Sequence, residues 1–134
     1  MGQLDEFLLN RSEKEFNWSD NNCLRFVHDA LAYMGKDNIP SEWCMGYDSK
    51  LSASKVYKRN LRKYGFKNII EAMDDRFDRI LTLHPKDGMI VARKVQNIMG
   101  YAFGIAYNKN CVCVTEQGLK SLDVEASDLF WEAN

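Results

Sequence analysis

Apolar residues recur at helical spacing in the first half of the chain. They predict helices over residues 4–8, 23–34, 52–64 and 68–77. The residues expected at helix ends stand at the right places, because Asn22 precedes the second stretch and Gly35 and Gly65 follow the second and third. The first half of the chain is therefore predicted to be helical.

Beyond residue 77 the spacing of apolar residues changes to every second position. It predicts strands over residues 88–93, 101–107, 111–115 and 118–124. The turns between them are short, so neighbouring strands should be antiparallel. Phe130 and Trp131 are expected to close the core or to cover a sheet edge. Helices followed by an antiparallel sheet predict an α+β fold, with residues 1–134 as a single domain.

Cys23 begins the central helical pattern. At 100° per residue it lies near the middle of an apolar arc of roughly 140°, formed by Phe26, Val27, Ala30, Leu31 and Met34. The free N–H groups at a helix start favour a thiolate, which is the setting of a nucleophile. The same place also suits a small buried residue without chemistry, because free cysteine is among the most buried residue types. Both interpretations fit the position of Cys23.

Residues 36–52 read as a loop that is long for a compact domain. It contains Trp43 and Tyr47, and it is a candidate flap over the surface that Cys23 faces. The helix predicted after it carries five cations on the side opposite its apolar stripe of Ala53, Tyr57, Leu61 and Tyr64. These cations are Lys55, Lys58, Arg59, Arg62 and Lys63. Such a face can bind an anionic partner, or it can simply be solvated.

Composition narrows the classes of partner. The 134 residues hold 18 Lys and Arg and 19 Asp and Glu, and this net charge of −1 does not favour nucleic acid or a membrane surface. No apolar stretch approaches the ~20 residues of a membrane span, and the N-terminus has no secretion signal, so synthesis in a cytosol is expected. The four cysteines are not spaced as the ligands of a zinc site usually are. Cys111 and Cys113 could provide two ligands, which is half of a metal site. We predict that the cysteines are free thiols and that the protein binds neither a metal nor a cofactor.

Short motifs along nearly the whole chain occur in the order known from one superfamily. In chain order they are Phe16-Asn17-Trp18, Cys23, Phe26, Asp29, Gly35, Tyr64-Gly65-Phe66, Gly88-Met89-Ile90-Val91, Phe103-Gly104-Ile105, Gly118-Leu119 and Trp131. With these residues the chain resembles the papain-like fold of the NlpC-type cysteine peptidases. It resembles more closely a small phage- and prophage-encoded family related to them.

This resemblance implies a nucleophilic cysteine on the central helix, activated by a histidine on the second core strand. NlpC-type enzymes cleave the stem peptides of peptidoglycan, and phages carry such domains in their tails. Cys23 stands at the nucleophile's position, but Ala102 stands at the position of the histidine. Asn22 and Met89 stand where the family usually has acids.

The two histidines of the chain lie at other positions in the sequence than the one that the family's histidine occupies. His28 is five residues after Cys23 on the same helix, which turns it about 140° away from the thiol. His84 could reach the thiol only if residues 79–85 fold across the site; otherwise it is a surface loop residue. General acid–base assistance is commonly worth ~10²–10⁴ in rate, and with Ala102 that assistance is missing.

We therefore predict a non-catalytic bacteriophage virion or tail component with a degenerate peptidase fold, which acts as a structural or binding module. The alternative is an active cysteine peptidase or amidase that cleaves peptidoglycan stem peptides during phage entry. The expected partners are other virion or tail proteins, with a homo-oligomer and peptidoglycan as further candidates. Synthesis in the host cytoplasm and a place in the virion follow from the resemblance.

Overall fold

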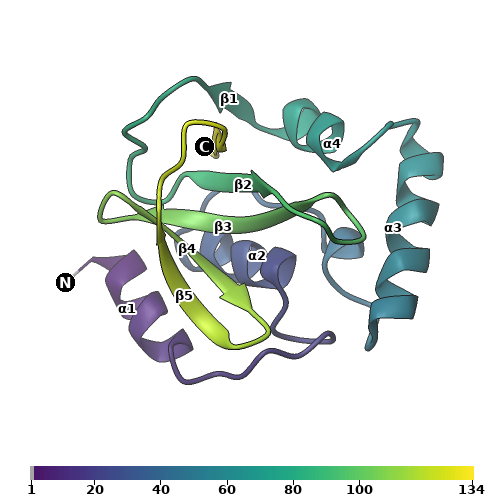
Figure 1. Cartoon of the computed structure of the whole chain (residues 1–134), viewed down its shortest axis with the longest axis horizontal. Coiled ribbons are helices and arrows are strands. Elements are labelled where there is room, and N and C mark those ends of the chain that lie inside the picture. Colours follow the sequence, from purple (N-terminus) through teal and green to yellow (C-terminus); the bar gives the residue numbers. More distant parts are fainter. Residues whose placement is uncertain (1) are drawn as a thin grey trace.

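The computed structural model describes residues 2–134, and these fold into helices packed on one antiparallel sheet (Figure 1). The helices are α1 (Gln3–Arg11), α2 (Cys23–Tyr33), the 3₁₀ turn η1 (Ser41–Trp43), α3 (Lys50–Tyr64) and α4 (Ile69–Arg76). The strands are β1 (Asp78–Ile80), β2 (Ile90–Lys94), β3 (Tyr101–Tyr107), β4 (Asn110–Thr115), β5 (Gly118–Asp123) and β6 (Leu129–Glu132). The predicted α+β class is confirmed.

The sheet has the strand order β1-β6-β2-β3-β4-β5, and every pair in it is antiparallel. The four predicted strands agree with β2 to β5 within two residues. The sequence did not predict β1 and β6 as strands. Since β6 lies between β1 and β2, Trp131 belongs to the interior of the sheet rather than to an edge.

Helix α2 lies against β3 and β4 and supplies the centre of the core. Phe26, Val27, Ala30 and Leu31 are fully buried, as the periodicity predicted. The helix begins where Asn22 Oδ1 accepts the backbone N–H of Arg25, and Gly35 after its end takes the left-handed conformation. Cys23 is therefore the first residue of the central helix, also as predicted.

Helix α3 begins two residues earlier than predicted because Ser49 caps it, accepting the N–H of Ser52. Its predicted apolar stripe is partly wrong. Tyr64 remains 44% exposed, whereas Val56 and Asn60 are buried. The cause is tertiary, because Asn60 Nδ2 donates to the carbonyl of Glu42 beside η1 and so turns this side of the helix inward.

Gly104 of β3 has no room for a side chain. A Cβ atom there would lie 3.0 Å from Cys113 Cβ and still closer to the carbonyl oxygen of Val112 on β4. We expect Gly104→Ala to lower the free energy of unfolding by about 2 kcal/mol or more, measured by urea unfolding. In the control Gly2→Ala the new Cβ makes only an ordinary contact of 3.5 Å, so a comparable loss there would contradict the steric explanation.

Candidate functional site

The chain before Cys23 is held in a tight turn. Asn17 and Asn21 pair with each other through both backbone groups, at 3.1 and 3.0 Å. The buried Asn21 side chain donates to the carbonyls of Lys14 and Glu15 and accepts from Arg11 Nε at 2.8 Å. Because every polar atom of the Asn21 side chain is used, the turn has one defined shape.

Arg11 joins this turn to the central helix. Its guanidinium pairs with Asp29 of α2 at 2.7 Å and lies over the rings of Phe7 and Phe26. Asp29 also accepts from Arg25 Nε at 3.1 Å. The arrangement fixes α1, the turn and α2 relative to one another, and so fixes the position of Cys23.

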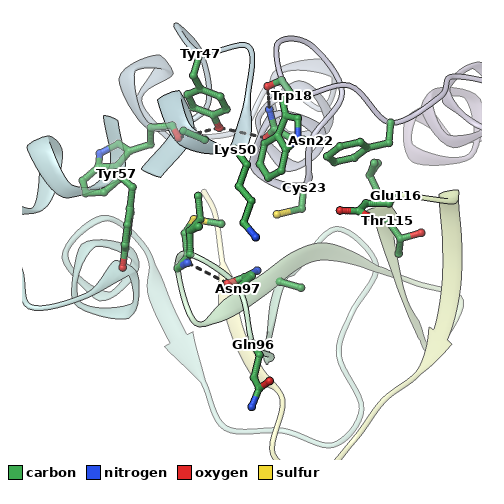
Figure 2. Close-up of a pocket in the computed structure, with 17 residues that line it drawn as sticks. Trp18, Asn22, Cys23, Tyr47, Lys50, Tyr57, Gln96, Asn97, Thr115 and Glu116 are labelled. Carbon is green, nitrogen blue, oxygen red and sulfur yellow. Dashed lines mark hydrogen bonds between the residues drawn. The ribbon is translucent and has the colours of Figure 1, made fainter. Parts of the chain in front are cut away.

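Cys23 opens into a pocket of about 320 Å³ (Figure 2). Four stretches of chain line it, and the side chains are mainly apolar and aromatic. They are Phe16, Trp18, Asn22, Cys23, Trp43, Tyr47, Lys50, Ala53, Tyr57, Gln96, Asn97, Ile98, Met99, Ala102, Val114, Thr115 and Glu116. Figure 2 shows the Cys23 sulfur and the Lys50 amine both directed into this space. An apolar cavity with a few convergent polar groups is typical of a binding site.

The predicted loop over residues 36–52 forms one wall of the pocket through Trp43 and Tyr47. The Tyr47 hydroxyl lies 3.4 Å from both Asn22 Oδ1 and the carbonyl of Trp43, so this wall contacts the cap of α2 directly. Burial raises the pKa of Tyr47 well above its usual value, so that the phenol stays protonated. The expectation that this loop covers the surface faced by Cys23 is met.

The Cys23 side chain is partly buried at the pocket wall, and its surroundings disfavour the thiolate. Burial raises its pKa, and the backbone N–H groups of Phe103, Leu24 and Cys23 itself oppose this only in part. Of the two interpretations that the sequence left open, the helix N-terminus by itself favoured the thiolate. That local effect exists, but the loss of solvent around the sulfur outweighs it.

Among the described residues 2–134, no histidine side chain lines the pocket. Ala102 of β3, at the position that the resemblance assigns to the base, is in the pocket wall. His28 lies on α2 with its Nδ1 2.8 Å from the carbonyl oxygen of Ile39, and His84 is exposed in the loop before β2. The hypothesis that residues 79–85 bring His84 to the thiol is wrong, because they lie outside the pocket lining.

Over residues 2–133 the sequence matches the family described as Domain of unknown function (DUF6950). The chain belongs to this family. No match was found among curated proteins or among solved structures. The family assignment thus covers the whole fold, including the pocket and Cys23, and carries no activity with it.

The second predicted site, on α3, is separate from the pocket. Lys55, Lys58, Arg59, Arg62 and Lys63 are all exposed, and none of them is in the pocket lining. Lys63 pairs with Glu42 at 3.1 Å and lies over the ring of Tyr64. The structure therefore presents the cations as one helix face, and it brings a different α3 residue, Lys50, to the pocket.

Sequence reasoning missed the pocket residues contributed by two turns. Gln96 and Asn97 come from the connection between β2 and β3, Thr115 is the last residue of β4, and Glu116 begins the turn between β4 and β5. In the sequence these polar residues indicate only turns between strands, and nothing in them indicates a pocket. Only the pairing of β3 with its neighbours on both sides places the two turns beside Cys23.

The remaining cysteines are free and mostly buried. Cys44 and Cys111 are buried, and burial raises the pKa of each to about 12. Within residues 2–134 no cluster of three or more His, Cys, Asp or Glu side chains is placed to hold a metal ion. Nor is any helix in that part of the chain both long enough and apolar enough to cross a bilayer.

Proposed function

We propose that this domain is a non-catalytic module with a papain-like, NlpC-type fold, acting through binding or assembly rather than peptide cleavage. One observation supports the proposal: Cys23 at the start of α2 opens into a pocket whose wall, over the described residues 2–134, contains Ala102 and no histidine. The order of helices and strands supports the NlpC-type assignment. A central helix begins with cysteine and packs on an antiparallel sheet, as in the resemblance drawn from the sequence.

Peptide cleavage by a cysteine requires a thiolate and a proton for the leaving amine. The raised pKa of Cys23 keeps the sulfur protonated at neutral pH, and the pocket offers no imidazole that could exchange the proton. General acid–base catalysis typically contributes ~10²–10⁴ in rate, so its loss removes most of the activity expected of such a site. What remains is a shaped apolar pocket and an unused thiol.

As the biological setting we propose a bacteriophage virion or tail component. The support is the similarity of the motif order to the phage-encoded relatives of the NlpC peptidases. A compact domain with an aromatic pocket at one place and an exposed helix at another offers two separate contact surfaces to neighbouring proteins.

Alkylation by iodoacetamide tests this proposal. We expect Cys23 in the folded protein to react at neutral pH several-fold more slowly than free cysteine, because its pKa is raised and its sulfur is desolvated. Peptide mapping by mass spectrometry separates Cys23 from Cys44, Cys111 and Cys113. Incubation with purified peptidoglycan should release no more peptide from the natural protein than from Cys23→Ala.

Ala102→His is the matched variant, since it adds the missing imidazole at the expected position. We expect it to speed alkylation of Cys23 and to shift the pH profile of that reaction toward lower pH. Rapid alkylation of the natural protein, together with peptide release that Cys23→Ala abolishes, would overturn the proposal and establish the peptidase.

A further inference from the structure

Helix α3 concentrates positive charge to a degree unlike the rest of the chain. It holds six cations and no acid, so the remainder of a chain whose net charge is −1 carries −7. Lys58, Arg59 and Arg62 are exposed, and none of the three has an ion-pair partner among the described residues. Charges segregated in this way indicate an electrostatic contact surface.

A hollow of about 370 Å³ lined by free carboxylates lies elsewhere on the molecule. The segment after α1 and the turn between β4 and β5 form it, and its charged residues are Glu13, Lys14, Glu15 and Glu116. Lys14 pairs with Asp20 at 3.6 Å. None of the three glutamates pairs with a cation in residues 2–134, so the hollow as a whole attracts positive charge.

We propose that the exposed face of α3 binds the glutamate-lined hollow of a second copy of this chain. Cations follow one another at helical spacing on this face. Together Lys55, Lys58, Arg59 and Arg62 form a stripe about 10 Å long on a regular helix. The hollow presents three carboxylates for this stripe. A second copy fits better than nucleic acid, because the −7 carried by the rest of the chain repels a polyanion that approaches α3.

The geometry of this contact makes it open-ended. In Figure 1 helix α1 lies at the left and α3 at the right, and the cations of α3 and the glutamates of the hollow come from different segments of the chain. Because the two surfaces are different, each added copy leaves one α3 face and one hollow free. Such head-to-tail association produces rings or filaments rather than a closed dimer, which suits the proposed role as an assembly module. The inference rests on that role for its biological meaning, but it depends on no property of Cys23.

Sedimentation velocity at increasing protein concentration tests the contact. At about 0.01 M salt we expect the mean mass to rise with concentration beyond that of a dimer. At about 1 M salt, where exposed charges are screened within a few ångströms, we expect monomer. A protein that stays monomeric at low salt and high concentration would overturn the proposal.

Charge reversal then identifies the two surfaces. The α3 variant carries Lys58→Glu, Arg59→Glu and Arg62→Glu, and the hollow variant carries Glu13→Lys, Glu15→Lys and Glu116→Lys. We expect each variant alone to lose association by about tenfold or more in the association constant. Mixing the two should restore assembly, because each reversed surface now meets its complement. Circular dichroism checks that both variants remain folded.

A matched control separates this contact from a general effect of charge. Lys86→Glu, Lys94→Glu and Lys109→Glu change the net charge as the α3 variant does, at exposed positions that belong neither to α3 nor to the lining of the hollow. We expect these changes to leave association within about twofold of the natural protein. Failure of the mixed variants to assemble, or an equal loss in the control, would show that α3 faces another partner or only solvent. Because Glu116 also lines the Cys23 pocket, alkylation of Cys23 is measured on the natural protein, and neither outcome here changes that test.

Discussion

Trp131→Ala should lower the free energy of unfolding by about 3–5 kcal/mol. Trp131 is fully buried in β6, between β1 and β2, and its ring lies 6.5 Å from that of Phe103. The indole N–H donates to Asp74 Oδ1 at 2.8 Å, and Arg79 lies over the ring. Truncation would leave a cavity at the place where the last strand joins the core.

Urea unfolding followed by far-UV circular dichroism measures this loss. Trp131→Phe keeps most of the ring volume but removes the N–H donor, so we expect a loss of about 1–2 kcal/mol. Trp18→Ala, at the half-buried pocket wall, should cost less than Trp131→Ala because its ring is partly in solvent already. Equal stability of Trp131→Ala and the natural protein would show that β6 does not support the core.

Asp128→Ala should destabilise the fold by about 3 kcal/mol, the lower end of the range for a broken buried ion pair. The carboxylate is inaccessible to solvent and accepts two bonds from Arg93, at 2.9 and 2.8 Å, and one from the N–H of Glu125. Without this carboxylate, the Arg93 guanidinium still donates to the carbonyl of Asp123 and pairs with the exposed Glu125 at 3.6 Å. The pair thus fastens the turn before β6 to β2.

This pair also makes stability depend on pH. Burial alone would raise the pKa of Asp128, but the Arg93 guanidinium and the N–H of Glu125 hold it below its usual value. A lowered folded-state pKa contributes stability that is present above the unfolded value of about 3.9 and is lost as the pH falls through the folded-state pKa. The difference between the natural protein and Asp128→Ala should therefore be constant near neutrality and shrink below about pH 4.

The control is Asp123→Asn, an exposed carboxylate at the end of β5 near the same turn. We expect it to change stability by less than about 0.5 kcal/mol, with no added pH dependence in acid. If Asp123→Asn and Asp128→Ala cost the same, burial of the Arg93 pair is not the reason for the effect.

Both predictions concern the attachment of β6 to the sheet. Trp131 and Asp128 both hold β6 in the sheet, and β6 pairs with β2, which in turn pairs with β3. Since β3 carries Ala102 of the pocket wall and Phe103, whose N–H lowers the pKa of Cys23, the pocket depends on the last residues of the chain. Loss of β6 should therefore expose the Cys23 thiol to alkylation.

The sequence by itself determined the features that arise within one helix or one hairpin. The start of α2 at Cys23 follows from the side chain of Asn22, which caps the helix, and its end follows from the left-handed Gly35. Strands β2 to β5 follow from alternation over five or more residues and from short turns. Each of these signals acts between neighbours in the chain, so no knowledge of the fold is needed to read them.

Only the tertiary structure decided the remaining strands and the character of the site. Strand β1 has three residues, too few for a periodicity, and it exists because Asp78–Ile80 pairs with residues 130–132 far along the chain. The pocket joins residues from four separate stretches, which no local pattern can bring together. The thiol shows the physical reason most clearly: the helix terminus that lowers its pKa is local, whereas the burial that raises it requires β3, η1 and the turns to be in place.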